Sequence, residues 1–232
     1  MIEYIGKCVL IDKKILVVGD LHLGYEDSLN RSGVFVSRVM FNEMILYFDK
    51  VFEKIGKVKE IVLLGDVKHN FGGISEQEWG DTLRLLDYFS QKTKKIVIVK
   101  GNHDKIIEPI ARKREIVVKD YYIYNEYCFL HGDKDFEEIY DRKIKVWIIG
   151  HGHPAVKLRE GVKIEKYKCF LEGEYKKKKI IIAPSFIEFS EGSDPRESEL
   201  CLAWNFDLNK FNVKIVGGGL DVLDFGKLKD LS

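Results

Sequence analysis

Five of the six histidines of this chain stand in short motifs together with Asp, Asn or Gly. The motifs are GDLH at 19–22, GNHD at 101–104, LHGD at 130–133 and GHGH at 150–153, and a further GD lies at 65–66. Imidazole nitrogens and carboxylate oxygens grouped in this way are typical ligands of Mn, Fe, Zn, Co or Ni. Because the motifs contain no cysteine, they argue against an iron–sulfur centre or a purely structural zinc site.

The number of candidate ligands indicates more than one metal ion. In chain order the candidates are Asp20, His22, Asp66, Asn102, His103, Asp104, His131, His151 and His153. One tetrahedral ion takes four ligands, whereas a larger set suits two ions about 3.5–4 Å apart that share a carboxylate. We therefore predict a dinuclear centre. Two such ions would lower the pKa of a bridging water, so that hydroxide could attack a phosphate ester in line without a covalent intermediate.

The elements that must position these groups are buried strands. The runs KILVVGD, EIVLLGD, KIVIVKGNHD, YCFLHGD and VWIIGHGH each indicate a strand that ends in a polar loop. Helical patterns lie between the first three runs, which predicts an α/β fold with a mostly parallel or mixed sheet. Ligands of such sheets gather outside the carboxyl ends of the strands, so these loops should converge on one site.

Two helices have clear sequence signals. The first is predicted from Ser37 as N-cap to a stop at Gly56, with apolar residues at steps of three and four. The second begins at a capping box formed by Ser75 and Glu78. After residue 156 the pattern favours hairpins and a second sheet, and the C-terminal part is predicted to contain two strands around a turn at Asn209.

Length and charge limit the possible classes of protein. With 232 residues and 45% hydrophobic content, we expect a single domain over residues 1–232. The net charge of +1 gives no global attraction to nucleic acid or membrane. The sequence has no long apolar segment and no export signal, so we expect a soluble cytoplasmic protein with no membrane partner. The four cysteines, Cys8, Cys128, Cys169 and Cys201, are expected to be buried thiols.

The five motifs, in this order and at these distances, resemble those of the calcineurin-like metallophosphoesterases, from about residue 15 to residue 190. GDLHLGYE, GDVKHNFG and the late PSF and EGSDP look like a prokaryotic subgroup related to the ligase-associated DNA repair endonucleases and, more distantly, to the double-strand-break repair nuclease subunit. The resemblance implies a metallophosphoesterase-like β-sandwich, in which two mixed sheets are flanked by helices in four αββα layers.

The resemblance also implies a role for each candidate. Asp20, His22 and His153 would hold one ion. Asn102, His131 and His151 would hold the other, with Asp66 bridging the two. The histidines of GHGH would thus serve different ions, with Gly152 allowing a tight turn between them. His103 would protonate the leaving oxygen or contact the phosphate, and Asp104 would orient its ring. Mn is the expected metal, with Fe, Zn, Co or Ni as alternatives.

Substrate contacts follow less directly from the motifs. Lys68 and His69 come just after Asp66 and could reach the phosphate, although a loop-stabilising contact explains them equally well. Glu26, Arg31 and Arg38 could line the rim. The run Lys176–Lys179 reads as a solvated turn.

The leading hypothesis is a manganese-dependent phosphodiesterase whose partner is a phosphate ester, with DNA as the expected substrate of a nuclease. The alternative is a small-molecule or cyclic-nucleotide phosphodiesterase or phosphatase. A non-catalytic protein-binding scaffold is a third hypothesis. A nuclease would need a track of Lys and Arg beside the metals, for which the only candidates are Arg31, Arg38, Lys68 and the Lys176 run.

Overall fold

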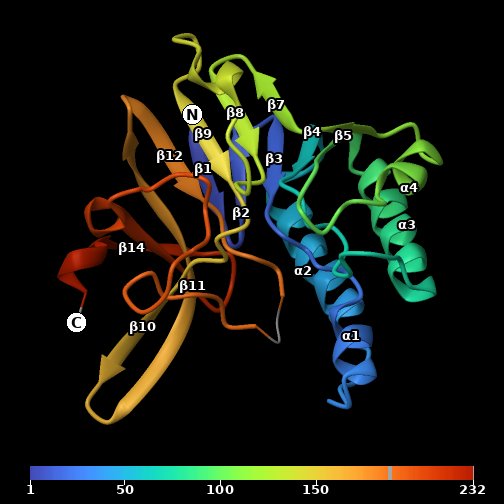
Figure 1. Cartoon of the computed structure of the whole chain (residues 1–232), viewed down its shortest axis with the longest axis horizontal. Coiled ribbons are helices and arrows are strands. Elements are labelled where there is room, and N and C mark those ends of the chain that lie inside the picture. The colour runs from blue at the N-terminus through green and yellow to red at the C-terminus, as the bar shows by residue number, and fades with distance from the viewer. Residues whose placement is uncertain (188–189, 232) are drawn as a thin grey trace.

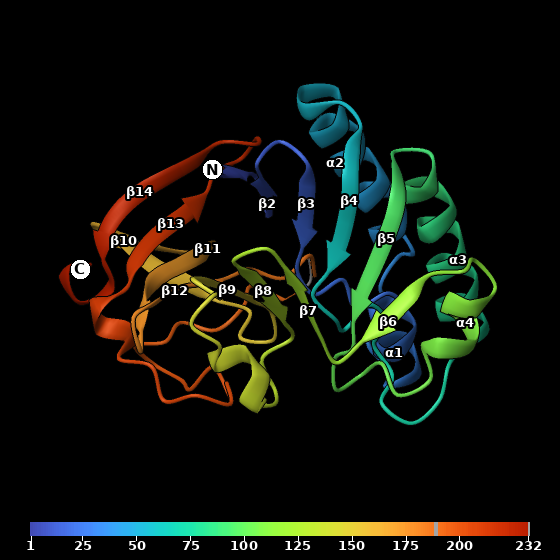
Figure 2. The same cartoon turned by 90° about the horizontal axis from the view of Figure 1, so that it is seen from above.

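Two β-sheets lie face to face, and the α-helices cover the outer face of one of them (Figures 1 and 2). The computed structural model describes residues 1–187 and 190–231. The first sheet has the order β1(Ile2–Ile5), β2(Cys8–Ile11), β3(Ile15–Val18), β4(Val58–Leu63), β5(Thr93–Val99) and β6(Val117–Lys119). Strands β1 to β3 are antiparallel and β3 to β6 are parallel, so the sheet is mixed.

The second sheet is mixed as well. Its order is β14(Val222–Lys227), β13(Asn212–Val216), β11(Lys163–Tyr175), β12(Lys178–Ile182), β9(Val146–Ile149), β8(Tyr127–Leu130) and β7(Tyr121–Tyr124). Strands β8, β9 and β12 are parallel. β10(Ala155–Glu160) pairs with the first half of β11, and the two strands form a hairpin that projects from the sheet (Figure 1).

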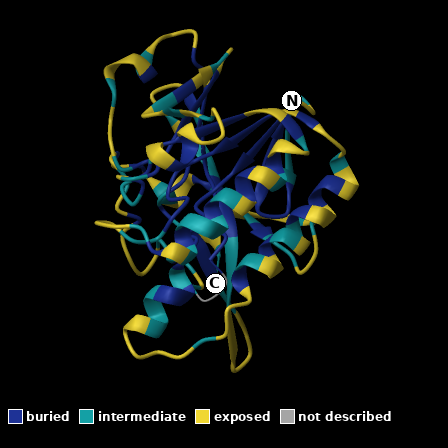
Figure 3. Ribbon diagram, turned by 90° about the vertical axis from the view of Figure 1, so that its right-hand side faces the viewer, coloured by how far each residue is buried: buried dark blue, intermediate teal, exposed yellow. Residues whose placement is uncertain are grey.

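The helices are α1(Tyr25–Arg31), α2(Met40–Ile55), α3(Glu76–Ser90) and α4(Glu108–Arg112). Helices α2, α3 and α4 pack on the first sheet and expose their outer faces (Figure 3). The outer face of the second sheet is covered by η1(Glu137–Tyr140), η2(Leu208–Lys210), η3(Leu228–Asp230) and an irregular segment that contributes Trp204 and Phe206. The two mixed sheets and the flanking helices are therefore confirmed, but the fourth layer, within the described residues, is built from 3₁₀ turns and loop instead of long helices.

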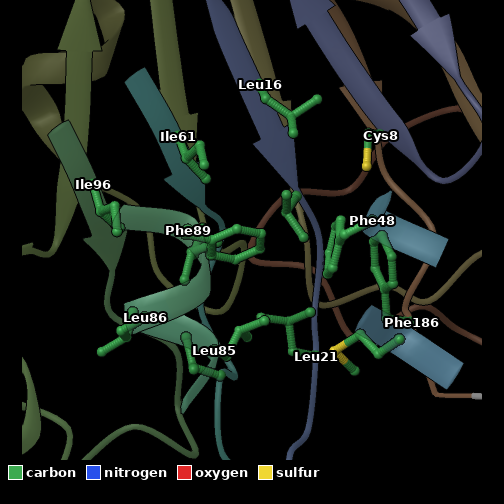
Figure 4. Packing of buried hydrophobic residues seen from close by; sticks show 14 of the residues in the cluster. Cys8, Leu16, Leu21, Phe48, Ile61, Leu85, Leu86, Phe89, Ile96 and Phe186 are labelled. Carbon is green, nitrogen blue, oxygen red and sulfur yellow. The ribbon is translucent and has the colours of Figure 1, made fainter. Parts of the chain in front are cut away.

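Strand residues alternate between two cores because successive side chains point to opposite faces of a sheet. On β3, Leu16 and Val18 face the helices, whereas Ile15 and Val17 face the second sheet. Figure 4 shows Leu16 of β3 and Phe48 and Phe89 of the helices in the same core. Burial on both faces explains why these strands read as continuous apolar runs.

Most of the predicted elements are confirmed. All five predicted strands are present as β3, β4, β5, β8 and β9, and Ser75 and Glu78 form the predicted capping box of α3. The start of α2 was predicted wrongly, because its N-cap is Val39 and not Ser37. Here the carboxylate of Glu26 accepts hydrogen bonds from the N–H groups of Val39 and Met40, at 2.7 and 2.8 Å, and replaces a local cap.

Two further expectations require correction. Asn209 lies in the 3₁₀ turn η2, and the C-terminal strand pair is formed by β13 and β14 instead, on either side of the glycines at 217–219. Cys8, Cys128 and Cys169 are buried as expected, but Cys201 is exposed.

Among the described residues, no helix has the length and apolar character needed to cross a bilayer.

Candidate metal centre

The predicted ligands lie at the carboxyl ends of strands from both sheets. Asp20 and His22 follow β3, Asp66 follows β4, and Asn102 follows β5. His131 follows β8, and His151 and His153 follow β9. Backbone hydrogen bonds from the N–H groups of Leu21 and His22 to the carbonyl of Asp66 join the first two loops. Groups up to about 130 residues apart are thereby brought to one edge of the sandwich.

Two clusters of side chains have the spacing of metal ligands. In the first, His153 Nε2 lies 3.4 Å from Asp20 Oδ1 and 3.3 Å from His22 Nε2. In the second, His131 Nε2 lies 2.9 Å from Asn102 Oδ1 and 3.1 Å from His151 Nδ1. These are the two sets that the sequence analysis assigned to separate ions.

Asp66 lies between the clusters. Its Oδ2 is 3.5 Å from His22 Nε2 in the first cluster and 3.4 Å from His131 Nε2 in the second. The residue is only 2% exposed, and a carboxylate buried to this extent requires cationic or hydrogen-bonding partners. A carboxylate that faces both sets is placed to be shared by two ions.

Hydrogen bonds behind the ligands fix the orientation of the imidazoles. Nδ1 of His131 donates to the carbonyl of Leu64 at 2.8 Å, so Nε2 is the ring nitrogen that faces the cluster. The backbone N–H of His151 donates to the carboxylate of Asp20 at 3.0 Å. These hydrogen bonds therefore hold the side chains of His131 and Asp20 in position.

Several ligand residues adopt a left-handed backbone, which is uncommon for residues with a Cβ. φ is 46° at His22, 45° at Asp66, 62° at His151 and 43° at His153. Strain of this kind is concentrated at functional sites, where the surrounding structure holds it in place. Gly152, which the sequence analysis expected to make the tight turn, has no positive φ, so the flanking histidines themselves make the turn.

Burial and charge set the protonation of the centre. Burial lowers the pKa of His22 to about 3, which leaves a neutral imidazole that can donate its lone pair to a metal. Burial also acts to lower the pKa of His131, but the hydrogen bond to Asp66 and the charges of Asp20 and Asp66 outweigh it and raise this pKa to about 9. A metal ion would therefore displace a proton from His131.

His103 lies beside the shared carboxylate. Its backbone N–H donates to Asp66 Oδ1 at 2.9 Å, and its Nε2 is 3.9 Å from Asp66 Oδ2. Nδ1 of the ring makes a hydrogen bond with the carbonyl of His69. Phe71 covers one side of the imidazole, with 3.6 Å between ring centroids. Nε2 is thus the ring nitrogen that faces the clusters.

The expected contact between Asp104 and the ring of His103 is absent, because the carbonyl of His69 occupies that position. The buried carboxylate of Asp104 instead accepts hydrogen bonds from the N–H groups of Val67 at 3.0 Å and Gly101 at 3.1 Å. Burial and the negative charge of Asp66 raise the pKa of Asp104 to about 6. This residue ties the loop after β4 to the loop after β5.

The predicted substrate contacts lie in different surroundings. His69 is close to the centre, with its Nδ1 at 3.3 Å from His22 Nδ1. Lys68 is fully buried, and its ammonium donates to the carbonyl of Asn70, which is the loop-stabilising contact. Glu26 is 2% exposed and caps α2, so it does not line the rim. Arg38 is exposed beside Asp27, at 3.5 Å.

Two residues near the centre were not recognised in the sequence. Glu78 was interpreted only as part of a capping box, but its Oε1 also accepts hydrogen bonds from the N–H groups of His69 and Asn70, at 3.0 and 2.6 Å. Phe71 was not singled out, and the sequence gives no signal that its ring packs on His103.

The donors fit divalent transition metals. Buried carboxylates and imidazoles converge with nitrogen–oxygen and nitrogen–nitrogen separations of 2.9–3.6 Å, which suits chelation of small cations. His22, His69 and His103 form a third group with ligand spacing that shares His22 with the first. Since affinity for such donors rises along the first-row series, the donor set does not select one metal.

A mixed α/β sandwich with a two-cluster His/Asp centre defines a metal-dependent phosphoesterase. The chain belongs to the calcineurin-like phosphoesterase family, whose sequence pattern matches residues 13–219. The nuclease MPE of Pseudomonas putida has a similar structure, with a TM-score of 0.65 and 16% sequence identity over 97% of this chain and 94% of that one.

Two structures of Vps29 from Entamoeba histolytica match more weakly. A double mutant of Vps29 and the wild type complexed with zinc each have a TM-score of 0.39 and 14% identity, over 91% of this chain and 99% of theirs. A comparison with curated proteins finds no match.

Proposed function

We propose that this protein is a phosphodiesterase that hydrolyses DNA with the help of two divalent metal ions. Both ions are expected to be Mn. The observation that carries the proposal is the position of Asp66, which faces both ligand clusters while His103 lies beside it. When bound, the ions would supply a water of lowered pKa and neutralise charge on the phosphate.

The side chains of the chain itself would have distinct tasks. Asp20, His22 and His153 form one holding set, and Asn102, His131 and His151 form the other. Nδ1 of His103 donates to the carbonyl of His69, so Nε2 faces the clusters, and in the imidazolium form this nitrogen would give its proton to the departing oxygen. His69, whose Nδ1 lies near His22, would contact the phosphate.

Two features support DNA as the substrate. The Pseudomonas putida protein MPE, which shares the fold, is named a nuclease. Arg31 and Arg38, which line a cavity of about 530 Å³ beside α1, expose about two thirds of their side chains and could contact the backbone of a strand. Both guanidiniums pair with Asp27, so phosphate would have to compete with this carboxylate.

The test is hydrolysis of four substrates by the metal-reconstituted protein: bis-nitrophenyl phosphate, nitrophenyl phosphate, single-stranded DNA and a cyclic nucleotide. We expect activity on the first and third that Asp66→Asn abolishes together with metal binding. The matched control is Asp207→Asn, which changes an exposed aspartate on the far side of the second sheet. This variant should retain both activity and metal binding. Hydrolysis of the monoester alone would contradict the proposal, and cleavage of the cyclic nucleotide alone would favour a small-molecule phosphodiesterase.

A further inference from the structure

The loop between Asp66 and α3 places an aromatic ring at the edge of the centre. Phe71 is 50% exposed. This exposure is unfavourable, because it leaves much of a large apolar ring in contact with water. One face of its ring lies against the imidazole of His103, at 3.6 Å between centroids. Because that face is covered while half of the residue is exposed, the opposite face is open to solvent.

Phe71 also lines a cavity. Its volume is about 290 Å³, and it is lined by Arg31, Asn70, Phe71, Gly72, Gly73, Ile74 and Ser75. A Cβ added at Gly72 or Gly73 would meet no atom within 4 Å, so the loop leaves room next to the ring. Arg31 is the only charged residue that lines the cavity among the residues the structure describes, and its side chain is 65% exposed.

The base of the loop is held firmly although its tip is open. The carbonyl of His69 accepts from His103, the carbonyl of Asn70 accepts from Lys68, and the N–H groups of both residues donate to Glu78. Three buried or half-buried side chains thus fix the backbone on the N-terminal side of Phe71. The ring is positioned relative to the centre and is not an arbitrary surface residue.

We propose that Phe71 is a stacking platform for an unpaired nucleobase next to the scissile phosphate, and that it directs the enzyme to single-stranded DNA. This inference rests on the proposed function. An aromatic face beside an exposed arginine is the combination that binds single strands, because every base has a π-face and each is followed by a phosphate. In a duplex, neighbouring bases cover these faces, so a base must be unpaired to use the platform.

The experiment compares a thymidine oligonucleotide with an abasic oligonucleotide of equal length, which has the same phosphates but no bases. Phe71→Ala should raise KM on the thymidine strand by about 5- to 140-fold, the range that corresponds to loss of one base–aromatic stack. It should leave KM on the abasic strand unchanged, and any change in kcat should be equal on both strands. Phe71→Trp should retain the wild-type KM.

Controls separate stacking from packing. Phe71→Leu keeps apolar bulk over His103 without a π-face, so it should behave as Phe71→Ala does. Phe225→Ala removes an exposed phenylalanine on β14, at the outer edge of the second sheet, and should change neither parameter. An equal rise in KM on both strands, or no rise on either, would overturn the inference and leave the nuclease proposal intact. If the wild type hydrolyses bis-nitrophenyl phosphate but neither strand, the nuclease proposal fails and this inference fails with it.

Discussion

Replacement of Glu78 by Gln tests how helix α3 positions the centre. The side chain is completely buried, and its two oxygens accept three backbone N–H groups, from His69, Asn70 and Ser75, at 3.0, 2.6 and 2.8 Å. The amide of Gln is isosteric but keeps one acceptor oxygen. Its NH₂ group must therefore face at least one of these N–H groups.

The expected cost follows from the three hydrogen bonds. Two of them would remain but lose the charge of the carboxylate, at about 1 kcal/mol each. The third would be lost and leave a buried N–H without a partner, at about 1–3 kcal/mol. We therefore expect Glu78→Gln to lower the free energy of unfolding by about 3–5 kcal/mol, and the Tm by roughly 10 °C for a chain of this length.

Activity should fall as well, at temperatures where the variant is folded. The backbone of His69 and Asn70 would be held less tightly, and the carbonyl of His69 is the group that orients the ring of His103. We expect kcat on bis-nitrophenyl phosphate to fall by about 10- to 100-fold, since misplacement of a catalytic group costs rates of this order. The ligands of the two clusters do not contact Glu78 directly, so metal content should be retained.

Glu76→Gln is the matched control because it lies in the same helical turn and is exposed. It should lose only an interaction with the helix dipole, about 0.5 kcal/mol, and retain full activity. The two variants are compared by urea unfolding, thermal melts and steady-state kinetics. If Glu78→Gln unfolds and turns over as Glu76→Gln does, the assigned role of Glu78 is wrong.

The remaining predictions concern the acid, the loop packing, a buried ion pair and the ions themselves. His103→Ala should keep both ions but lose about 10²- to 10⁴-fold in kcat on esters with poor leaving groups, and much less with nitrophenolate; equal losses on both would exclude the acid role. Gly101→Ala should reduce the metal content after dialysis, because a Cβ there would lie 2.2 Å from Asp66 Oδ1, whereas Gly80→Ala, with open space around it, should not. Asp194 is buried, but hydrogen bonds from Arg196 and from the N–H groups of Lys157 and Arg196 outweigh burial and lower its pKa. A lowered pKa stabilises the fold fully above the unfolded value, and this contribution is lost as the pH falls through the lower folded value. Asp194→Asn should therefore cost about 2 kcal/mol at pH 7, and urea unfolding should show this difference shrink as the pH falls below about 4. Addition of Mn at about 100 times Kd should raise the free energy of unfolding by about 2.7 kcal/mol for each ion bound, an increase that EDTA reverses and that Asp66→Asn lacks.

The fold could be predicted from the sequence where an element is buried and its burial is visible as a local pattern of apolar residues. β3, β4, β5, β8 and β9 are buried on both faces, so each is a continuous apolar run that ends in a polar motif. The capping box of α3 is local as well, since Ser75 and Glu78 are three residues apart. The start of α2 could not be predicted in this way, because Glu26, which caps it, comes from α1.

The sequence by itself determined which groups can bind metal and that they follow strand ends, because ligand types and apolar runs are properties of neighbouring residues. Only the tertiary structure decided where each side chain points. It turned Asp104 toward Val67 and away from the ring of His103, buried Lys68, and brought Phe71 onto that ring. These outcomes depend on contacts between loops that follow different strands. These contacts form only when the two sheets have packed together. The same packing holds the left-handed backbone at Asp66 in place.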